Sequence, residues 1–193
     1  SGEVRLPLTP AQSGIWYAQR IDSSHTVYNI AEYLDIHGPV DPFLFESALR
    51  RVVGETDALR VRFVENGELP EQLVLPAVDF AVPVHDLTSE PDPLGSARAL
   101  MDEDNTLPID LFGDRLFSFA LFRVAEDRWL WYHRIHHILL DGAGVAMLAP
   151  RVSEVYSALT AGSPVPDSPF RPLRDLVAAE QEYAGSEAYA ADR

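Results

Sequence analysis

Residues Trp129–Gly142 read WLWYHRIHHILLDG, and this stretch decides the fold. Its first half alternates large apolar residues with other types, which predicts a β-strand whose successive side chains point to opposite faces. If the strand continues to the two adjacent histidines, they cannot both face one cavity. We expect one histidine to be packed into the scaffold and the other to be free to meet a substrate. The two predicted faces carry Trp129, Trp131, His133, Ile135 and His137 on one side and Tyr132, Arg134 and His136 on the other.

A second apolar segment precedes this one. Residues 117–124 are apolar on both faces, as in a central strand that is covered on each side. Residues 125–128 predict a turn that returns the chain antiparallel. The innermost hairpin of the sheet is therefore expected to end in the two histidines, and a rigid element of this kind holds a catalytic group better than a loop does.

The other predicted elements interleave helices with strands. Thr9, Pro10 and Gln12 have the pattern of a capped helix start, Asn66-Gly67 is a strong hairpin signal, and Pro150 should kink or split its helix. The sequence thus predicts an α/β fold with a mixed or antiparallel sheet covered by helices, and no internal domain boundary. Helices are expected from residues 10 and 42, over 93–104, after Gly142 until Gly162 and Pro164 close that helix, and over 173–183. Strands are expected over 29–37, 59–64, 72–75 and 82–87.

Composition excludes several classes of protein. The chain has 193 residues, the size of one domain or one lobe, and a formal net charge of −15, which disfavours nucleic acid and anionic membranes as partners. It has no cysteine and no lysine, so thiol chemistry and a lysine Schiff base are excluded. No apolar run reaches the roughly 20 residues of a membrane span. We expect a cytoplasmic protein.

The motif His136-His137-x-x-x-Asp141-Gly142 resembles HHxxxDG of condensation domains in non-ribosomal peptide synthetases. The wider chloramphenicol acetyltransferase-like superfamily shares an HxxxD core, which is His137 and Asp141 here. The resemblance implies that His137 is the catalytic histidine, that His136 and Asp141 hold the loop, and that Gly142 lets substrate approach closely. It also implies a layered sandwich fold.

Two further stretches support the resemblance. LTPAQSGIW, residues 8–16, resembles the first core motif of these domains, and residues 54–63 resemble the second, RHExLRTxF, in their latter half. Leu59, Arg60 and Phe63 fit the second motif, whereas Glu55, Thr56, Asp57 and Val61 depart from it. In the family the arginine of this motif is thought to pair with the aspartate of HHxxxDG. The resemblance therefore implies an Arg60–Asp141 ion pair that supports the site.

The family's domains are about twice as long as this chain, with two lobes around a tunnel. Residues 3–193 are therefore expected to be an N-terminal lobe without the C-terminal lobe, and 172–193 a helical segment leading toward it. The implied reaction is amide formation between a donor acyl, aryl or peptidyl thioester and the amine of an acceptor aminoacyl thioester. Both would be held on the phosphopantetheine arms of carrier proteins, next to a downstream adenylation module. No cofactor of its own is implied, and the lobe alone should be inactive.

Three alternatives remain open. His133, His136, His137 and Asp141 are metal-ligand types, but strand alternation splits the histidines between two faces. A coenzyme A-dependent acyltransferase of the same superfamily would need only the HxxxD core. A non-catalytic docking module of an assembly line would ordinarily carry a degraded motif, and the motif here is intact.

Overall fold

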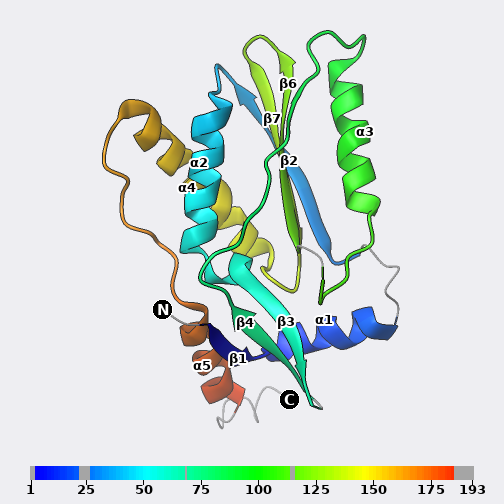
Figure 1. Cartoon of the computed structure of the whole chain (residues 1–193), viewed down its shortest axis with the longest axis vertical. Coiled ribbons are helices and arrows are strands. Elements are labelled where there is room, and N and C mark those ends of the chain that lie inside the picture. Colours follow the sequence, from blue (N-terminus) through cyan, green and yellow to red (C-terminus); the bar gives the residue numbers. More distant parts are fainter. Residues whose placement is uncertain (1–2, 22–26, 68, 114–115, 185–193) are drawn as a thin grey trace.

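The computed structural model describes residues 3–21, 27–67, 69–113 and 116–184 (Figure 1). The predicted helix at 173–183 is present as Leu173–Ala184, and residues 185–193 lie outside the described part. The helices are α1 Pro10–Ile21, α2 Pro42–Glu55, α3 Pro93–Thr106, α4 Gly142–Ala161 and α5 Leu173–Ala184, with a 3-10 turn η1 at Asp57–Arg60. The strands are β1 Val4–Pro7, β2 Asn29–His37, β3 Val61–Asn66, β4 Leu69–Val74, β5 Val84–Asp86, β6 Phe117–Ala125 and β7 Arg128–His136.

A four-stranded sheet in the order β2-β7-β6-β5 forms the centre of the molecule. The β2–β7 and β6–β7 pairs are antiparallel and β5 pairs with β6 in parallel, so the sheet is mixed as predicted. Helices α2 and α4 cover one face and α3 covers the other (Figure 1). The predicted innermost hairpin is confirmed, because β6 and β7 are the two inner strands.

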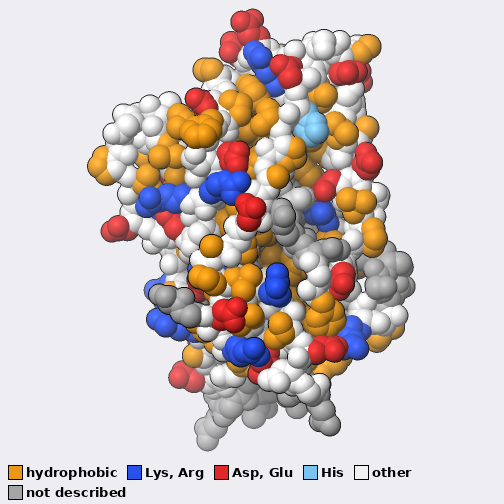
Figure 2. All heavy atoms as spheres, viewed as in Figure 1, with side chains coloured by type: hydrophobic (Ala, Val, Ile, Leu, Met, Phe, Trp, Pro, Cys, Tyr) orange, Lys and Arg blue, Asp and Glu red, His pale blue; other side chains and the backbone are white. Residues whose placement is uncertain are grey.

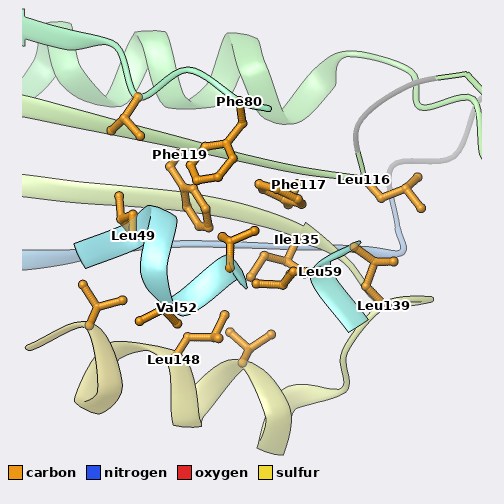
Figure 3. Packing of buried hydrophobic residues seen from close by; sticks show 14 of the residues in the cluster. Leu49, Val52, Leu59, Phe80, Leu116, Phe117, Phe119, Ile135, Leu139 and Leu148 are labelled. Carbon is orange, nitrogen blue, oxygen red and sulfur yellow. The ribbon is translucent and has the colours of Figure 1, made fainter. Parts of the chain in front are cut away.

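Strand alternation divides the core into two parts. Trp131 and Ile135 of β7 pack with Phe117 and Phe119 of β6 under α2 and α4, whereas Tyr132 lies on the α3 side. In Figure 3, Leu49 and Val52 of α2 and Leu148 of α4 lie against this sheet face. Each fully buried aliphatic or aromatic side chain contributes roughly 1.5–3 kcal/mol of transfer free energy. The hairpin is therefore fixed from both faces.

A second, three-stranded sheet in the order β1-β4-β3 lies beside α1 and α5 (Figure 1). The predicted hairpin at Asn66-Gly67 joins β3 to β4, and Gly67 has a positive φ of 74° that suits glycine. The predicted strand 59–64 starts later, at Val61, because Leu59 and Arg60 belong to η1. Helix α4 continues through Pro150 without a break, so the predicted split is wrong.

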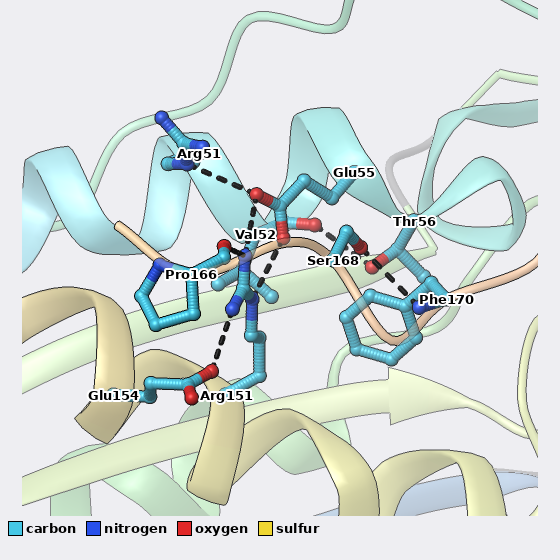
Figure 4. A network of polar contacts seen from close by, with 9 residues as sticks. All are labelled: Arg51, Val52, Glu55, Thr56, Arg151, Glu154, Pro166, Ser168 and Phe170. Carbon is cyan, nitrogen blue, oxygen red and sulfur yellow. Dashed lines mark hydrogen bonds and ion pairs between the residues drawn. The ribbon is translucent and has the colours of Figure 1, made fainter. Parts of the chain in front are cut away.

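A charged cluster of Arg51, Glu55, Arg151 and Glu154 joins α2, α4 and the connection 163–172 (Figure 4). The Arg151 side chain is only 1% exposed. It donates to both carboxylate oxygens of Glu55 at 2.9 Å, to Glu154 at 2.6 Å and to the carbonyl of Pro166 at 2.9 Å. These bonds hold the connection that leads into α5.

Acidic and basic side chains are interspersed with apolar ones over the face shown in Figure 2. Within the described part of the chain, no helix combines the length and the apolar character that crossing a bilayer requires.

Candidate active site

His136 is the last residue of β7, and its ring is buried with 1% exposure. The backbone N–H of Ile138 donates to Nδ1 at 3.2 Å, so Nδ1 carries a lone pair. Nε2 lies 2.8 Å from Oε1 of Gln19, whose amide group donates to the carbonyl of Ile109 at 3.1 Å. These partners assign the neutral tautomer with its hydrogen on Nε2. His136 is packed into the scaffold, as predicted for one of the two histidines.

The surroundings of His136 keep its ring neutral. Burial lowers the pKa of His136 from 6.5 to about 4, and the charges of His137 and Arg134 act in the same direction. A buried imidazole that accepts one hydrogen bond and donates another fixes the backbone around it without adding a charge.

His137 follows the end of the strand, and its side chain is exposed. Its backbone N–H donates to the carbonyl of Tyr28 at 2.7 Å, which anchors its main chain. Among the described residues, no group hydrogen-bonds to its imidazole. Its side chain lines a cleft together with residues of α1, the motif loop and α5. The structure thus brings one histidine of the pair to a surface where it can meet another molecule.

Asp141 ends the motif loop as the N-cap of α4. Its Oδ1 accepts from the backbone N–H of Gly144 at 2.7 Å, so it stabilises the helix start that lies beside His137. Gly142 begins α4, and a Cβ placed on it would meet no atom within 4 Å. The fold of this chain therefore does not itself require glycine at position 142.

The predicted ion pair between Arg60 and Asp141 is wrong. Arg60 pairs with Asp57 Oδ1 at 2.5 Å and also donates to the carbonyl of Leu75. The turn η1 causes this difference, because it places Asp57 three residues before Arg60 on the same side. The other carboxylate oxygen of Asp57 accepts from the backbone N–H of Leu173 at 3.0 Å, so Arg60 supports the start of α5 instead.

The cleft around His137 has mainly apolar walls. Leu140 of the motif loop lines it, together with Leu176 and Glu180 of α5. Within the described ranges, no group of three or more histidine, cysteine, aspartate or glutamate side chains is arranged to hold a metal ion. The cleft suits an apolar group next to a single imidazole.

Sequence reasoning missed two residues that hold the site, Gln19 and Gln72. Gln12 was identified through the core motif at residues 8–16 and through its capping box with Thr9, which the structure confirms at 2.9 and 3.2 Å. Its side-chain nitrogen also donates to Gln72 Oε1 at 2.9 Å and to the carbonyl of Ile138 at 3.1 Å. The available signal was the spacing of seven residues between Gln12 and Gln19, which puts both on one face of α1.

Comparison with known proteins identifies the family. Residues 3–193 match the model of the family described as "Condensation domain". This chain belongs to the condensation domain family. Such domains form amide bonds in non-ribosomal peptide synthetases, so the resemblance of the HHxxxDG motif reflects true membership of the family.

Several curated proteins are similar to this condensation-domain chain. Isonitrile lipopeptide synthase of Streptomyces coeruleorubidus is 48% identical over 191 residues, which cover 98% of this chain and 13% of that protein. A dimodular nonribosomal peptide synthase of Bacillus subtilis is 44% identical, covering 99% and 8%. Enterobactin synthase component F of Escherichia coli is 38% identical, covering 97% and 15%. The sequences of residues 128–142 and 168–177 alone predict a likeness to its condensation domain, which this comparison confirms.

Solved structures agree with this assignment. The starter condensation domain of rhizomide synthetase RzmA has a TM-score of 0.91 at 38% identity, over 98% of this chain and 48% of that one. A variant of it in complex with C8-CoA and Leu-SNAC has a TM-score of 0.94 at 38% identity, over 97% and 43%. The chain thus spans about half of a solved condensation domain and less than a sixth of these curated relatives.

Proposed function

We propose that this chain is the N-terminal lobe of a condensation domain, and that a C-terminal lobe closes the cleft around His137 into a channel. The length of the chain supports this, since it spans 48% of the solved starter domain with the same fold. Helix α5, at the end of the described residues, would lead toward the second lobe. The isolated lobe would be nearly inactive, because it leaves the site open to water and the substrates unpositioned.

The proposed reaction joins a donor acyl group to an acceptor amine. The nitrogen lone pair of an aminoacyl thioester attacks the donor carbonyl carbon, and the C–N bond forms as the C–S bond breaks. The departing sulfur leaves as a thiol, with a proton that replaces the one lost by nitrogen. His137 would hold the amine or accept its proton, and help of this kind typically contributes 10²–10⁴-fold to a rate.

The single observation that carries this proposal is the separation of the two motif histidines. His136 is neutral and buried, whereas His137 is exposed in a cleft with apolar walls. The open space beside Gly142 supports the same assignment, because a glycine that the fold does not need is explained by the close approach of a substrate.

The proposed partners are donor and acceptor carrier proteins, which present their thioesters on phosphopantetheine arms, and an adenylation module downstream. The chain would need no cofactor of its own. A second candidate donor is a free coenzyme A thioester, and a specific observation favours it: the similar starter domain is described in complex with C8-CoA and Leu-SNAC. Both candidates use the same His137 and the same bond changes.

The test is amide formation from C8-CoA and Leu-SNAC by the complete two-lobed domain. We expect His137→Ala to lower kcat by 10²–10⁴-fold. The matched control is His37→Ala, since the His37 side chain is 72% exposed on β2 and should change kcat by less than about twofold. Full activity of His137→Ala would overturn the assigned role, and full activity of the isolated chain would overturn the two-lobe proposal.

A further inference from the structure

Three of the four glutamines of this chain are buried, and all three lie around the motif. Gln12 is 8% exposed, Gln19 is 4% and Gln72 is 0%, whereas Gln181 on α5 is exposed. Burying an amide without hydrogen bonds costs roughly 1–3 kcal/mol by mutational measures, so a buried glutamine is retained where its bonds are made. We call Gln12, Gln19, Gln72 and His136 the glutamine network.

One end of the glutamine network fixes the residue before His137. Gln19 Oε1 accepts from Nε2 of His136 at 2.8 Å, and its amide nitrogen is oriented by the carbonyl of Ile109 at 3.1 Å. The orientation of this amide is therefore determined by two partners from different parts of the chain. It leaves the His136 ring with one position and one tautomer.

The other end fixes the residue after His137. The amide nitrogen of Gln12 donates to the carbonyl of Ile138 at 3.1 Å, while its oxygen accepts from the backbone N–H of Thr9 at 2.9 Å. Gln72 and Gln12 also bond reciprocally at 2.9 Å, and Gln72 donates to the carbonyl of Pro7. Helix α1, β4 and the motif loop are thus joined at one buried point.

We propose that Gln12 and Gln19 are positioning residues for His137. They lie seven residues apart on one face of α1, and they hold the two neighbours of His137 from the same side. The main chain of His137 is anchored between them by the carbonyl of Tyr28. The direction in which the exposed imidazole enters the cleft is thereby fixed by α1. The catalytic part of this inference rests on the proposed function of His137, while its structural part does not.

Glutamine is suited to this task for a physical reason. It supplies a donor and an acceptor without charge, and each of the two side chains uses both. A glutamate at either position would lose the donated bond and place a negative charge beside the motif. A negative charge close to His136 would favour its protonated form and disturb the neutral tautomer.

The experiment compares Gln12→Met, Gln19→Met and the exposed control Gln181→Met by amide hydrogen exchange of this chain. We expect the N–H groups of Ile138 and Leu139, which bond to the ring and carbonyl of His136, to exchange about tenfold faster in the first two variants. The exchange rates of amides in the centre of β6, and of all amides in the Gln181→Met chain, should change by less than about twofold. Equal acceleration everywhere, or none at the motif, would overturn the positioning role.

The nearly isosteric variants Gln12→Glu and Gln19→Glu replace the methionine variants if those do not fold, with the same expected exchange pattern. The catalytic part is measured in the complete domain with C8-CoA and Leu-SNAC. We expect kcat to fall about tenfold or more with KM within about twofold, because misplaced groups lose transition-state stabilisation rather than substrate binding. Unchanged kcat with faster motif exchange would overturn the catalytic part. The His137→Ala variant is measured in parallel. An unchanged kcat in that variant would indicate a failure of the proposed function, whereas an unchanged kcat in the glutamine variants alone would not.

Discussion

Two polar clusters, each built around buried side chains, hold distant parts of this chain together, and they differ in charge. The charged cluster, centred on Arg151 and Glu55, joins α2, α4 and the connection 163–172. The glutamine network joins α1, β4 and the motif loop through neutral amides and a neutral imidazole. Ionic contacts thus join α2 and α4 to the connection that leads into α5, whereas uncharged contacts hold His136 and Ile138 on either side of His137.

The difference has a consequence for His137. A buried charge next to the motif would bias the protonation of a histidine that is proposed to accept a proton or hold an amine. Neutral hydrogen bonds fix geometry without that bias. Burial opposes ionisation of Glu55, but its hydrogen bonds from Arg151 and Arg51 outweigh this effect and hold the pKa of Glu55 below its ordinary value. The charged cluster therefore remains ionised at neutral pH.

Breaking the charged cluster should have the largest effect. Arg151→Met leaves Glu55, Glu154 and the carbonyl of Pro166 without their buried donor, and we expect the free energy of unfolding to fall by about 3–5 kcal/mol. Urea denaturation measures it. The control Arg62→Met changes an exposed arginine and should cost less than about 0.5 kcal/mol. A loss below about 1 kcal/mol for Arg151→Met would show that the cluster does not stabilise the fold.

The neutral state of His136 in the glutamine network should make the free energy of unfolding depend on pH. The pKa of His136 is about 4 in the folded chain and 6.5 ordinarily, so between these values the unfolded chain binds a proton that the folded chain does not. The free energy of unfolding should therefore decrease as the pH falls from about 6.5 to about 4. This histidine contributes about 3 kcal/mol to the decrease, since a tenfold change in proton affinity is about 1.4 kcal/mol.

The matched variants for this prediction are His136→Gln and His37→Gln. We expect denaturation at pH 6.5 and at pH 4.5 to give a much smaller difference for His136→Gln than for the unaltered chain. His37→Gln should keep the difference of the unaltered chain, because the His37 side chain is exposed. Equal pH dependence of all three proteins would mean that His136 is not kept neutral by burial.

A change at Gln72 should have an intermediate effect. Gln72→Met removes the reciprocal partner of Gln12 and leaves the carbonyl of Pro7 without its donor. We expect a loss of about 1–3 kcal/mol, as for other buried groups left unpaired. The loss should not depend on pH between 6 and 8, since no charge is removed. Gln181→Met is the control. A loss of similar size in that exposed variant would show that the loss at position 72 does not result from buried groups left unpaired.

The smallest effect is expected at the helix cap between the two clusters. Asp141→Ala removes the bond to the N–H of Gly144 and should cost about 1 kcal/mol. Asp141→Ser keeps an acceptor and should restore most of this loss. Asp41→Ala, at the equivalent cap of α2, is a matched control with a similar cost. A loss of 3 kcal/mol or more at Asp141 alone would indicate an ion pair of the kind first expected with Arg60.

Sequence patterns predicted the elements that are determined by interactions between residues close together in the chain. Alternation of residue types predicted β2 and β7, an apolar run on both faces predicted β6, and the pattern of Thr9 and Gln12 predicted the start of α1. Alternation also predicted that only one histidine of the pair would be packed into the scaffold, whereas the choice of His137 as the free one came from the resemblance to the family. The partner of Arg60 could not be predicted in this way, because a single 3-10 turn decides which carboxylate it meets.

Contacts between distant residues were beyond sequence reasoning. Gln19 and His136 are 117 residues apart and Gln12 and Gln72 are 60 apart, and no periodic pattern connects such positions. The division of the strands into two sheets was hidden for the same reason. Helix α1 reads as an ordinary amphipathic helix with Trp16 in the core, and only the fold shows that its polar face holds the motif.

The central claim is that the fold gives two adjacent histidines opposite roles, and imidazole nitrogen NMR of this chain from pH 7.5 to 5 tests it most directly. We expect His136 to remain neutral with its hydrogen on Nε2 throughout this range. In the Gln19→Glu variant, the His136 ring should become protonated at a higher pH than it does in the unaltered chain. A His136 ring that becomes charged near pH 6.5, or that populates both tautomers, would contradict the account.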